Sequence, residues 1–228
     1  MATSTKGVER LVEIPSGRRR LGGILHVPPG ARGVVAFAHG SGSGRFSPRN
    51  QFVARALQGA GLATLLLDLL EEEEAEDREK VFDIALLAER LQSAADWLRR
   101  GTATSALHLG YFGASTGAGA ALVAAAREPA AVGAVVSRGG RPDLAMVHLP
   151  SVQAPTLLIV GGNDDVVIEL NEQALRRLRC RKELVIVPGA THLFEEPGAL
   201  EEVSRLAKEW FARYLTPAGG PSEEGERS

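Results

Sequence analysis

This 228-residue sequence has a single cysteine, no long apolar run and no large excess of charge of one sign. Cys180 is the single cysteine, so no disulfide can form within the chain, and a reducing cytoplasm is the expected compartment. No stretch approaches the roughly 18 apolar residues that a membrane span needs. Residues 1–7 are polar and have no apolar core of the kind that signal peptides carry. We therefore expect a cytoplasmic protein that does not associate with membranes.

The charge balance and the spacing of polar residues exclude further classes. The formal net charge is −2, which gives no electrostatic reason to expect binding to nucleic acid or to an anionic membrane. No metal-ligand spacing is present, and no glycine-rich loop ends in the Gly-Lys-Ser/Thr of a phosphate-binding P-loop. The sequence thus predicts a protein without metal or cofactor whose partner is a small molecule, and it leaves the oligomeric state open.

Strand-like and helix-like segments alternate along the chain and favour one domain over residues 1–215. Segments 8–14 and 21–27 flank a turn and predict an antiparallel hairpin. Buried strands are predicted at 33–38, 62–67 and 154–160, further strands at 107–112, 132–136 and 184–187, and helices at 50–59, 81–98, 118–126 and 200–214. This alternation predicts an α/β fold with a doubly wound, mostly parallel sheet. Residues 216–228 have no apolar anchor and are predicted to be a disordered tail.

Two short stretches of the sequence add to this prediction of the domain. Between Ser137 and Pro155 there is room for only one short helix, so no lid domain is expected and the site should be shallow and open. The acidic run from Glu71 to Asp77 is interpreted as a solvated loop and helix start, because acidic side chains are favourable near a helix N-terminus.

Segment 111–117 contains the pattern G-x-S-x-G between a predicted strand and an alanine-rich helix. This context is typical of a nucleophile elbow, in which a serine stands on a sharp strand-to-helix turn. Gly113 and Gly117 are needed because side chains there would clash with the neighbouring strand and helix. The turn exposes Ser115 Oγ and places the Thr116 amide at a helix N-terminus, where it can face a developing oxyanion. A glycine-rich junction with a buried serine is the alternative interpretation.

The partners that a nucleophilic serine requires follow two later strands. Asp164 and Asp165 come after the strand at 154–160, and His192 comes after the last strand. The chain order Ser…Asp…His is the one expected of α/β-hydrolases. We predict that His192 takes the proton of Ser115 and that one of the two carboxylates orients the imidazole.

On these motifs the chain resembles the small, lidless α/β-hydrolases of the dienelactone-hydrolase-like group. The matching segments are 39–42, 113–117, 161–164 and 189–192, and the likeness in layout spans roughly residues 8–215. The resemblance implies the α/β-hydrolase fold.

Three details of the site follow from this resemblance or depart from it. In the group, the acid follows the strand-end glycine by three residues, which implies Asp164 rather than Asp165. Dienelactone hydrolases proper use a cysteine nucleophile where this chain has Ser115, and the acid is doubled here. Because of the departure at the nucleophile, the resemblance does not imply the namesake substrate.

The loop after the first central strand is rich in glycine and carries His39. Nucleophile-elbow hydrolases take their second oxyanion donor from this loop. We therefore predict that the Ser41 amide pairs with the Thr116 amide to form the oxyanion hole. His39 itself is interpreted as a structural histidine of the loop.

Four arginines lie in segments that leave the predicted sheet at its carboxyl edge: Arg45, Arg49, Arg138 and Arg141. Glycines beside Arg138 and Arg141 allow a tight loop that directs a guanidinium inward. A planar guanidinium can bind a carboxylate or phosphate through two hydrogen bonds. The hypothesis is that Arg138 or Arg141 binds an anionic group of the substrate. The alternative is that these arginines pair with acids such as Asp143.

These residues predict a serine hydrolase that cleaves a small carboxylic ester, lactone or thioester through an acyl-enzyme. Ser115 attacks, His192 transfers the proton under Asp164, and the Ser41 and Thr116 amides bind the oxyanion. Two alternatives stay open. The same residues could transfer the acyl group to another acceptor, or the chain could be a non-catalytic binding or scaffold module on a hydrolase fold.

Overall fold

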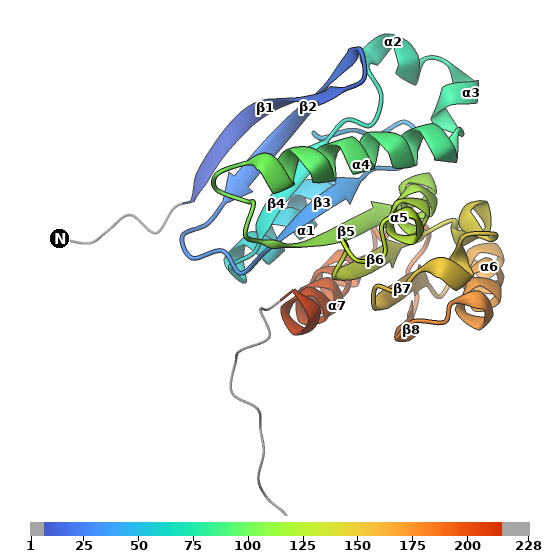
Figure 1. Cartoon of the computed structure of the whole chain (residues 1–228). Coiled ribbons are helices and arrows are strands. Elements are labelled where there is room, and N and C mark those ends of the chain that lie inside the picture. The colour runs from blue at the N-terminus through green and yellow to red at the C-terminus, as the bar shows by residue number, and fades with distance from the viewer. Residues whose placement is uncertain (1–6, 216–228) are drawn as a thin grey trace, which may run out of the picture.

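The computed structural model describes residues 7–215, so the predicted tail at 216–228 lies outside the described residues. One eight-stranded sheet runs through this part of the chain in the order β1-β2-β4-β3-β5-β6-β7-β8 (Figure 1). Its strands are β1 (Val8–Ser16), β2 (Arg19–Val27), β3 (Gly33–Ala38), β4 (Ala63–Leu67), β5 (His108–Ala114), β6 (Ala134–Arg138), β7 (Thr156–Gly161) and β8 (Lys182–Val187). Strands β3 to β8 pair in parallel, and the β1–β2 hairpin joins β4 antiparallel. The predicted fold is confirmed.

Helices cover both faces of this sheet. They are α1 (Pro48–Gly59), α2 (Glu72–Ala75), α3 (Arg78–Val81), α4 (Ile84–Arg100), α5 (Thr116–Arg127), α6 (Asp165–Arg177) and α7 (Ala199–Tyr214), with two 3-10 turns, η1 (Pro142–Ala145) and η2 (Leu149–Ser151). Side chains of α4, α5 and α6 share one core cluster, and side chains of α1 and α7 share the other. Because both faces are covered, β3, β4, β6 and β7 are buried at every position, which explains the apolar runs that form most of these strands.

Alternate side chains of one strand enter the two cores. In β6, Ala134 and Val136 pack with α1 and α7, whereas Val135 packs on the other face. This alternation is the period of two that a β-strand imposes on its side chains. Arg138 lies two residues beyond Val136, so its side chain leaves the strand on the α1–α7 face.

The segment after β4 differs from the expected single helix over 81–98. Val81 belongs to the short helix α3, and α4 begins only at Ile84. The break has a local cause, because the Asp83 side chain accepts a hydrogen bond from the Leu86 amide and so caps α4. Between β6 and β7 the chain forms the turns η1 and η2 instead of one short helix, and no lid helix is present in this stretch of the described chain.

Candidate active site

The turn between β5 and α5 has the geometry expected of a nucleophile elbow. Ser115 has a φ of +49°, in the left-handed region that L-residues rarely adopt. A Cβ at Gly117 would lie 2.2 Å from the Ala38 oxygen, and one at Gly113 would lie 2.4 Å from the Ala118 Cα. The steric need for both glycines is therefore confirmed. Such backbone strain persists only where the surrounding structure enforces it, and it is often found at active sites.

The loops after β7 and β8 bring Asp164 and His192 together. His192 Nδ1 lies 2.7 Å from Asp164 Oδ2. An ionised carboxylate can only accept a hydrogen bond, so Nδ1 carries the proton and Nε2 is left as an acceptor. Asp165, by contrast, is exposed and forms the first residue of α6. The contact thus agrees with the assignment of Asp164 over Asp165.

Backbone contacts hold these two loops against each other. The Asn163 amide donates to the Ala190 oxygen at 2.9 Å, and the Asn163 side chain donates to the Gly189 oxygen at 2.9 Å. On the other side of His192, the Phe194 amide donates to the Thr191 oxygen at 3.2 Å. Hydrogen bonds on both sides of His192 therefore hold its loop, and the Asp164 carboxylate contacts the imidazole itself.

The segment that follows β6 lies against both Ser115 and His192. The Ser115 amide donates to the Arg138 oxygen at 3.3 Å, and the Arg141 amide donates to the Ser115 oxygen at 3.0 Å. A Cβ at Gly139, in the same segment, would lie 3.5 Å from His192 Cε1. Among the residues that the structure describes, no hydrogen bond joins Ser115 Oγ to His192. In free enzymes this contact is often long and tightens only when substrate is bound.

The two predicted oxyanion donors are neighbours. The Ser41 amide donates to Thr116 Oγ1 at 3.1 Å, which joins the β3–α1 loop to the first residue of α5. A Cβ at Gly40 would lie 3.0 Å from Ser115 Cβ, so the loop backbone passes directly beside the serine. The Ser41 amide is thus occupied by a hydroxyl that an incoming oxyanion would have to replace.

His39 holds this loop in place. Its Nδ1 lies 2.9 Å from the Gly40 oxygen, and its Nε2 accepts a hydrogen bond from the Leu69 amide at 2.9 Å. Burial lowers the pKa of His39 and so favours the neutral ring that these two contacts require. The interpretation of His39 as a structural residue agrees with this geometry.

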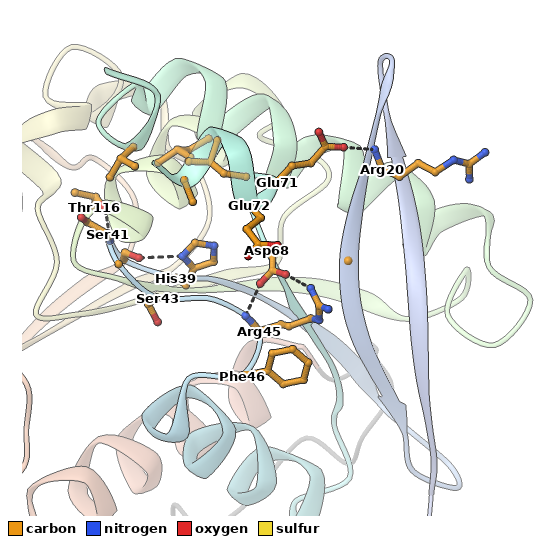
Figure 2. A pocket seen from close by; sticks show the side chains of 17 residues that line it. Arg20, His39, Ser41, Ser43, Arg45, Phe46, Asp68, Glu71, Glu72 and Thr116 are labelled. Carbon is orange, nitrogen blue, oxygen red and sulfur yellow. Dashed lines mark hydrogen bonds and ion pairs between the residues drawn. The ribbon is translucent and has the colours of Figure 1, made fainter. Parts of the chain in front are cut away.

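A cavity of about 710 Å³ opens beside the oxyanion loop. Figure 2 shows Ser41 and Thr116 at one end and Arg20 of the β1–β2 hairpin at the other. Its lining includes the apolar residues Phe46, Leu70, Val81 and Leu87 and the charged residues Arg20, Arg45, Asp68, Glu71 and Glu72. Helices α2 and α3 form part of its wall through Glu72, Ala75 and Val81, and the long-helix prediction did not contain this wall.

One ion pair within the cavity wall was not anticipated. Asp68 accepts hydrogen bonds from both the amide and the guanidinium of Arg45 (Figure 2). This ion pair links the loop that precedes α1 to the end of β4. The signal was present in the sequence, since Asp68 directly follows a predicted strand and Arg45 follows the oxyanion loop. Their pairing depends on β3 and β4 being neighbours, which the sequence alone does not specify.

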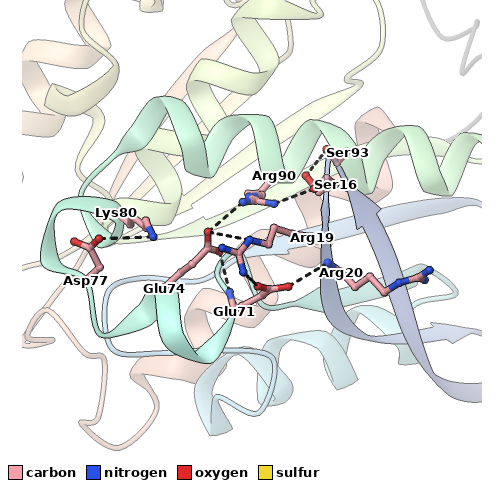
Figure 3. A network of polar contacts seen from close by, with 9 residues as sticks. All are labelled: Ser16, Arg19, Arg20, Glu71, Glu74, Asp77, Lys80, Arg90 and Ser93. Carbon is pink, nitrogen blue, oxygen red and sulfur yellow. Dashed lines mark hydrogen bonds and ion pairs between the residues drawn. The ribbon is translucent and has the colours of Figure 1, made fainter.

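The acidic run is not simply solvated, and Glu74 corrects that interpretation. Glu74 is 4% exposed, and its carboxylate lies 3.3 Å from Arg90 Nη2 of α4 (Figure 3). Arg90 also donates to the Ser16 oxygen at 3.1 Å, and Arg19 lies 3.8 Å from Glu74. This network joins the β1–β2 hairpin to α2 and α4. It therefore fixes the helix that closes one side of the cavity.

Replacement of Arg90 by methionine is expected to lower the free energy of unfolding by about 3 kcal/mol. Removing one member of a buried ion pair leaves the other charge desolvated, which typically costs about 3–5 kcal/mol. The lower end applies because Arg19 is still near Glu74. Urea denaturation measures the loss. The double variant Glu74→Leu/Arg90→Met removes both charges and should regain much of the stability. Equal losses in the single and double variants would contradict the argument.

The two arginines predicted to bind substrate lie in different surroundings. Arg141 forms two hydrogen bonds of 2.8 Å with the Asp143 carboxylate, which is the alternative that the sequence left open. Arg138 is 7% exposed, and its Nε and Nη1 atoms have no hydrogen-bond partner. Among residues 7–215, therefore, Arg138 has no acidic partner, whereas Arg141 has one.

Residues 7–215 contain neither a membrane-spanning helix nor a cluster of metal ligands. No helix there is both long and apolar enough to cross a membrane. In the same residues, no group of three or more histidine, cysteine, aspartate or glutamate side chains is arranged to hold a metal ion.

Comparison with solved structures identifies proteins with a similar fold. The crystal structure of a dienelactone hydrolase from Anabaena variabilis ATCC 29413 is 60% identical, with a TM-score of 0.90, and the match covers 92% of this chain and 99% of that one. Est1E from Butyrivibrio proteoclasticus shares the fold at 16% identity, with a TM-score of 0.77 and coverage of 89% and 98%.

Sequence comparison adds a longer relative and a family. A Mycobacterium tuberculosis H37Rv protein named "Putative phosphoribosyl transferase" is 57% identical over 214 residues. The match covers 94% of this chain but 48% of that protein, so the chain spans about half of its relative's length. The profile of the Dienelactone hydrolase family matches residues 23–215. The chain is an α/β-hydrolase and belongs to the dienelactone hydrolase family.

Proposed function

We propose that this protein is a serine hydrolase that cleaves a small carboxylic ester, lactone or thioester through an acyl-enzyme. The observation that carries the proposal is the 2.7 Å contact between His192 and Asp164 at the sheet edge where Ser115 stands on a strained turn. A neutral serine hydroxyl is a weak nucleophile, and an imidazole oriented by a carboxylate is the usual group that activates it.

In the proposed reaction, Ser115 Oγ attacks the carbonyl carbon while its proton passes to His192 Nε2. The Thr116 amide and the Ser41 amide stabilise the oxyanion that forms. Collapse of the tetrahedral intermediate breaks the bond to the leaving group, which takes the proton from Nε2. Water then attacks the acyl-enzyme with His192 as base, and a second collapse releases the acid and restores Ser115.

Hydrolysis is favoured over phosphoribosyl transfer for this chain. The mycobacterial relative that carries the transferase name is about twice as long, and the match covers nearly all of this chain. The same stretch is the one that matches the dienelactone hydrolase profile. We therefore assign hydrolase chemistry to this segment and carry no transferase activity over to it.

Labelling by a fluorophosphonate probe tests the proposal most directly. An activated serine should react rapidly at Ser115, and mass spectrometry locates the adduct. Incubation of an ester with water alone, and then with added alcohols or thiols, separates hydrolysis from acyl transfer. Absence of labelling would favour a binding or scaffold module. Faster product formation with an added acceptor than with water would favour an acyltransferase.

The cavity composition leads to a prediction about acyl chain length. We expect kcat/KM for p-nitrophenyl esters to stop rising beyond about four to six carbons, although each fully buried methylene could contribute about 0.8 kcal/mol. The reason is that Arg20, Glu71 and Glu72 line the cavity, and a long alkyl chain would have to displace water from them. A series from acetate to decanoate measures this, with Ser115→Ala as the background control. A steady rise up to decanoate would contradict the prediction.

A further inference from the structure

Asn171 is a buried polar residue in the middle of α6, the helix that begins directly after Asp164 (Figure 1). It is fully buried, and its Nδ2 atom donates to the Gly140 oxygen at 3.0 Å and to the Val167 oxygen at 2.8 Å. These two acceptors fix the orientation of the amide, since the opposite orientation would set its oxygen against both of them. Its Oδ1 atom has no hydrogen-bond partner in the described part of the chain. A buried acceptor without a partner lowers stability, so stability alone does not explain this residue.

The Gly140 oxygen belongs to segment 138–141, which binds both backbone polar groups of the nucleophile. The Arg138 oxygen accepts a hydrogen bond from the Ser115 amide at 3.3 Å, and the Arg141 amide donates to the Ser115 oxygen at 3.0 Å. Ser115 has a φ of +49°, and a strained conformation of this kind persists only where its surroundings enforce it. The two hydrogen bonds from segment 138–141 are part of that enforcement.

The same segment contacts the proposed general base. Gly139 has a φ of +51°, and a Cβ there would lie 3.1 Å from the His192 oxygen and 3.5 Å from His192 Cε1. A Cβ at Gly140 would overlap Ser137 Oγ, so the segment packs directly on β6 without room for side chains. Segment 138–141 therefore lies between Ser115 and His192 and touches both.

We propose that Asn171 is a positioning residue of the hydrolytic site. It holds segment 138–141 so that Ser115 Oγ and His192 Nε2 come within hydrogen-bonding distance when substrate is bound. This inference rests on the proposed function, since it concerns the proton transfer between these two residues. Asn171 lies about two turns after Asp164 along α6. One helix thus carries the acid that orients His192 at its start and, further along, the amide that holds the segment beside Ser115.

Asn171→Leu tests this role, because leucine has a similar size but no hydrogen-bond donor. It should lower kcat for a short activated ester by about 10- to 100-fold, since a displacement of about 1 Å in a reacting group can cost that much. Residues 138–141 do not line the cavity beside the oxyanion loop, so KM should change by less than about threefold. The rate constant for inactivation by a fluorophosphonate probe, which also needs an activated Ser115, should fall in parallel with kcat.

Thr104 provides the matched control, because it is another buried side chain that binds two backbone oxygens. It is 3% exposed, and its hydroxyl donates to the Leu98 oxygen at 2.6 Å and to the Gly101 oxygen at 3.4 Å, between α4 and β5. Thr104→Val and Asn171→Leu should each lower Tm by about 2–8 °C. The kcat of Thr104→Val should stay within about twofold of the wild-type value. This comparison separates the loss of a buried hydrogen bond from the loss of positioning.

A His192→Ala background separates positioning from a general disturbance of the site. Without the imidazole there is no proton transfer to position, so adding Asn171→Leu should lower the residual rate by less than about twofold. A disturbed oxyanion loop would instead cost the same factor with and without His192. The residual rate is measured at high enzyme concentration, as the excess over the rate in buffer alone.

Asn171→Ser is the second variant, for the case in which Asn171→Leu does not fold. Serine keeps a hydrogen bond to the Val167 oxygen one turn back along the helix, but it is one bond shorter than asparagine and loses Gly140. It should therefore show the same loss of kcat. Unchanged kcat in either folded variant, or an equal cost of Asn171→Leu with and without His192, would overturn the positioning role alone.

Failure of the proposed function has a different signature. The wild type would then neither hydrolyse esters nor react with the fluorophosphonate probe, and the role of Asn171 would be overturned together with the hydrolase proposal. Hydrolysis by the wild type, combined with a selective loss of kcat in Asn171→Leu and not in Thr104→Val, supports both.

Discussion

Ser115→Ala is expected to lower kcat/KM for a short activated ester by a factor of about 10⁴ or more. Residues that act as a unit in nucleophilic catalysis lose nearly all of the chemical rate when the nucleophile is removed. The oxyanion donors and the substrate site stay intact, so a residual rate above that in water should persist. Steady-state kinetics on the purified variant, with active-site titration to exclude contaminating enzyme, measure the loss.

A second substitution at this position separates loss of the hydroxyl from disturbance of the turn. Ser115→Gly also removes the nucleophile, but glycine adopts a positive φ without strain. It should therefore be as inactive as Ser115→Ala and more stable by roughly 1 kcal/mol. Substantial activity in either folded variant would show that another residue carries the chemistry.

Asp164→Asn is expected to cost a factor of about 10⁴ in kcat, a loss of the size seen when a triad carboxylate becomes an amide. An amide at this position can donate to His192 Nδ1 and so stabilise the wrong tautomer, with the proton on Nε2. Nε2 could then no longer accept the proton of Ser115. The pH dependence of kcat in the variant, together with its rate, measures the change.

Asp165→Asn is the matched control, because it makes the same chemical change one residue later. Asp165 is exposed and lies in the first turn of α6. Its loss should change kcat by less than about twofold, as for other surface substitutions. It should also reduce stability by a few tenths of a kcal/mol through the helix dipole. A larger rate loss at Asp165 than at Asp164 would reverse the assignment of the acid.

Much of the fold could be predicted because its signals are local. Strands of a covered parallel sheet carry runs of apolar residues, and the predicted segments at 33–38, 62–67 and 184–187 agree with the buried strands β3 and β4 and with the partly exposed edge strand β8 within two residues. The elbow could be predicted for the same reason. Gly113 and Gly117 are needed because a side chain at either position would clash with atoms a few residues away or at the end of the adjacent strand. The prediction of one helix over 81–98 was wrong because a single polar side chain sets the helix boundary there. Asp83 caps α4 and separates it from α3.

The sequence by itself determined the order of the elements, the position of Ser115 on its turn and the loops that carry Asp164 and His192. Only the tertiary structure decided which charges are paired. Arg141 pairs with Asp143, whereas Arg138, at the end of the strand that precedes Arg141, has no acidic partner in the described part of the chain. Periodicity and motifs report on residues close in sequence, whereas burial and pairing depend on which side chains the packed helices and strands bring into contact.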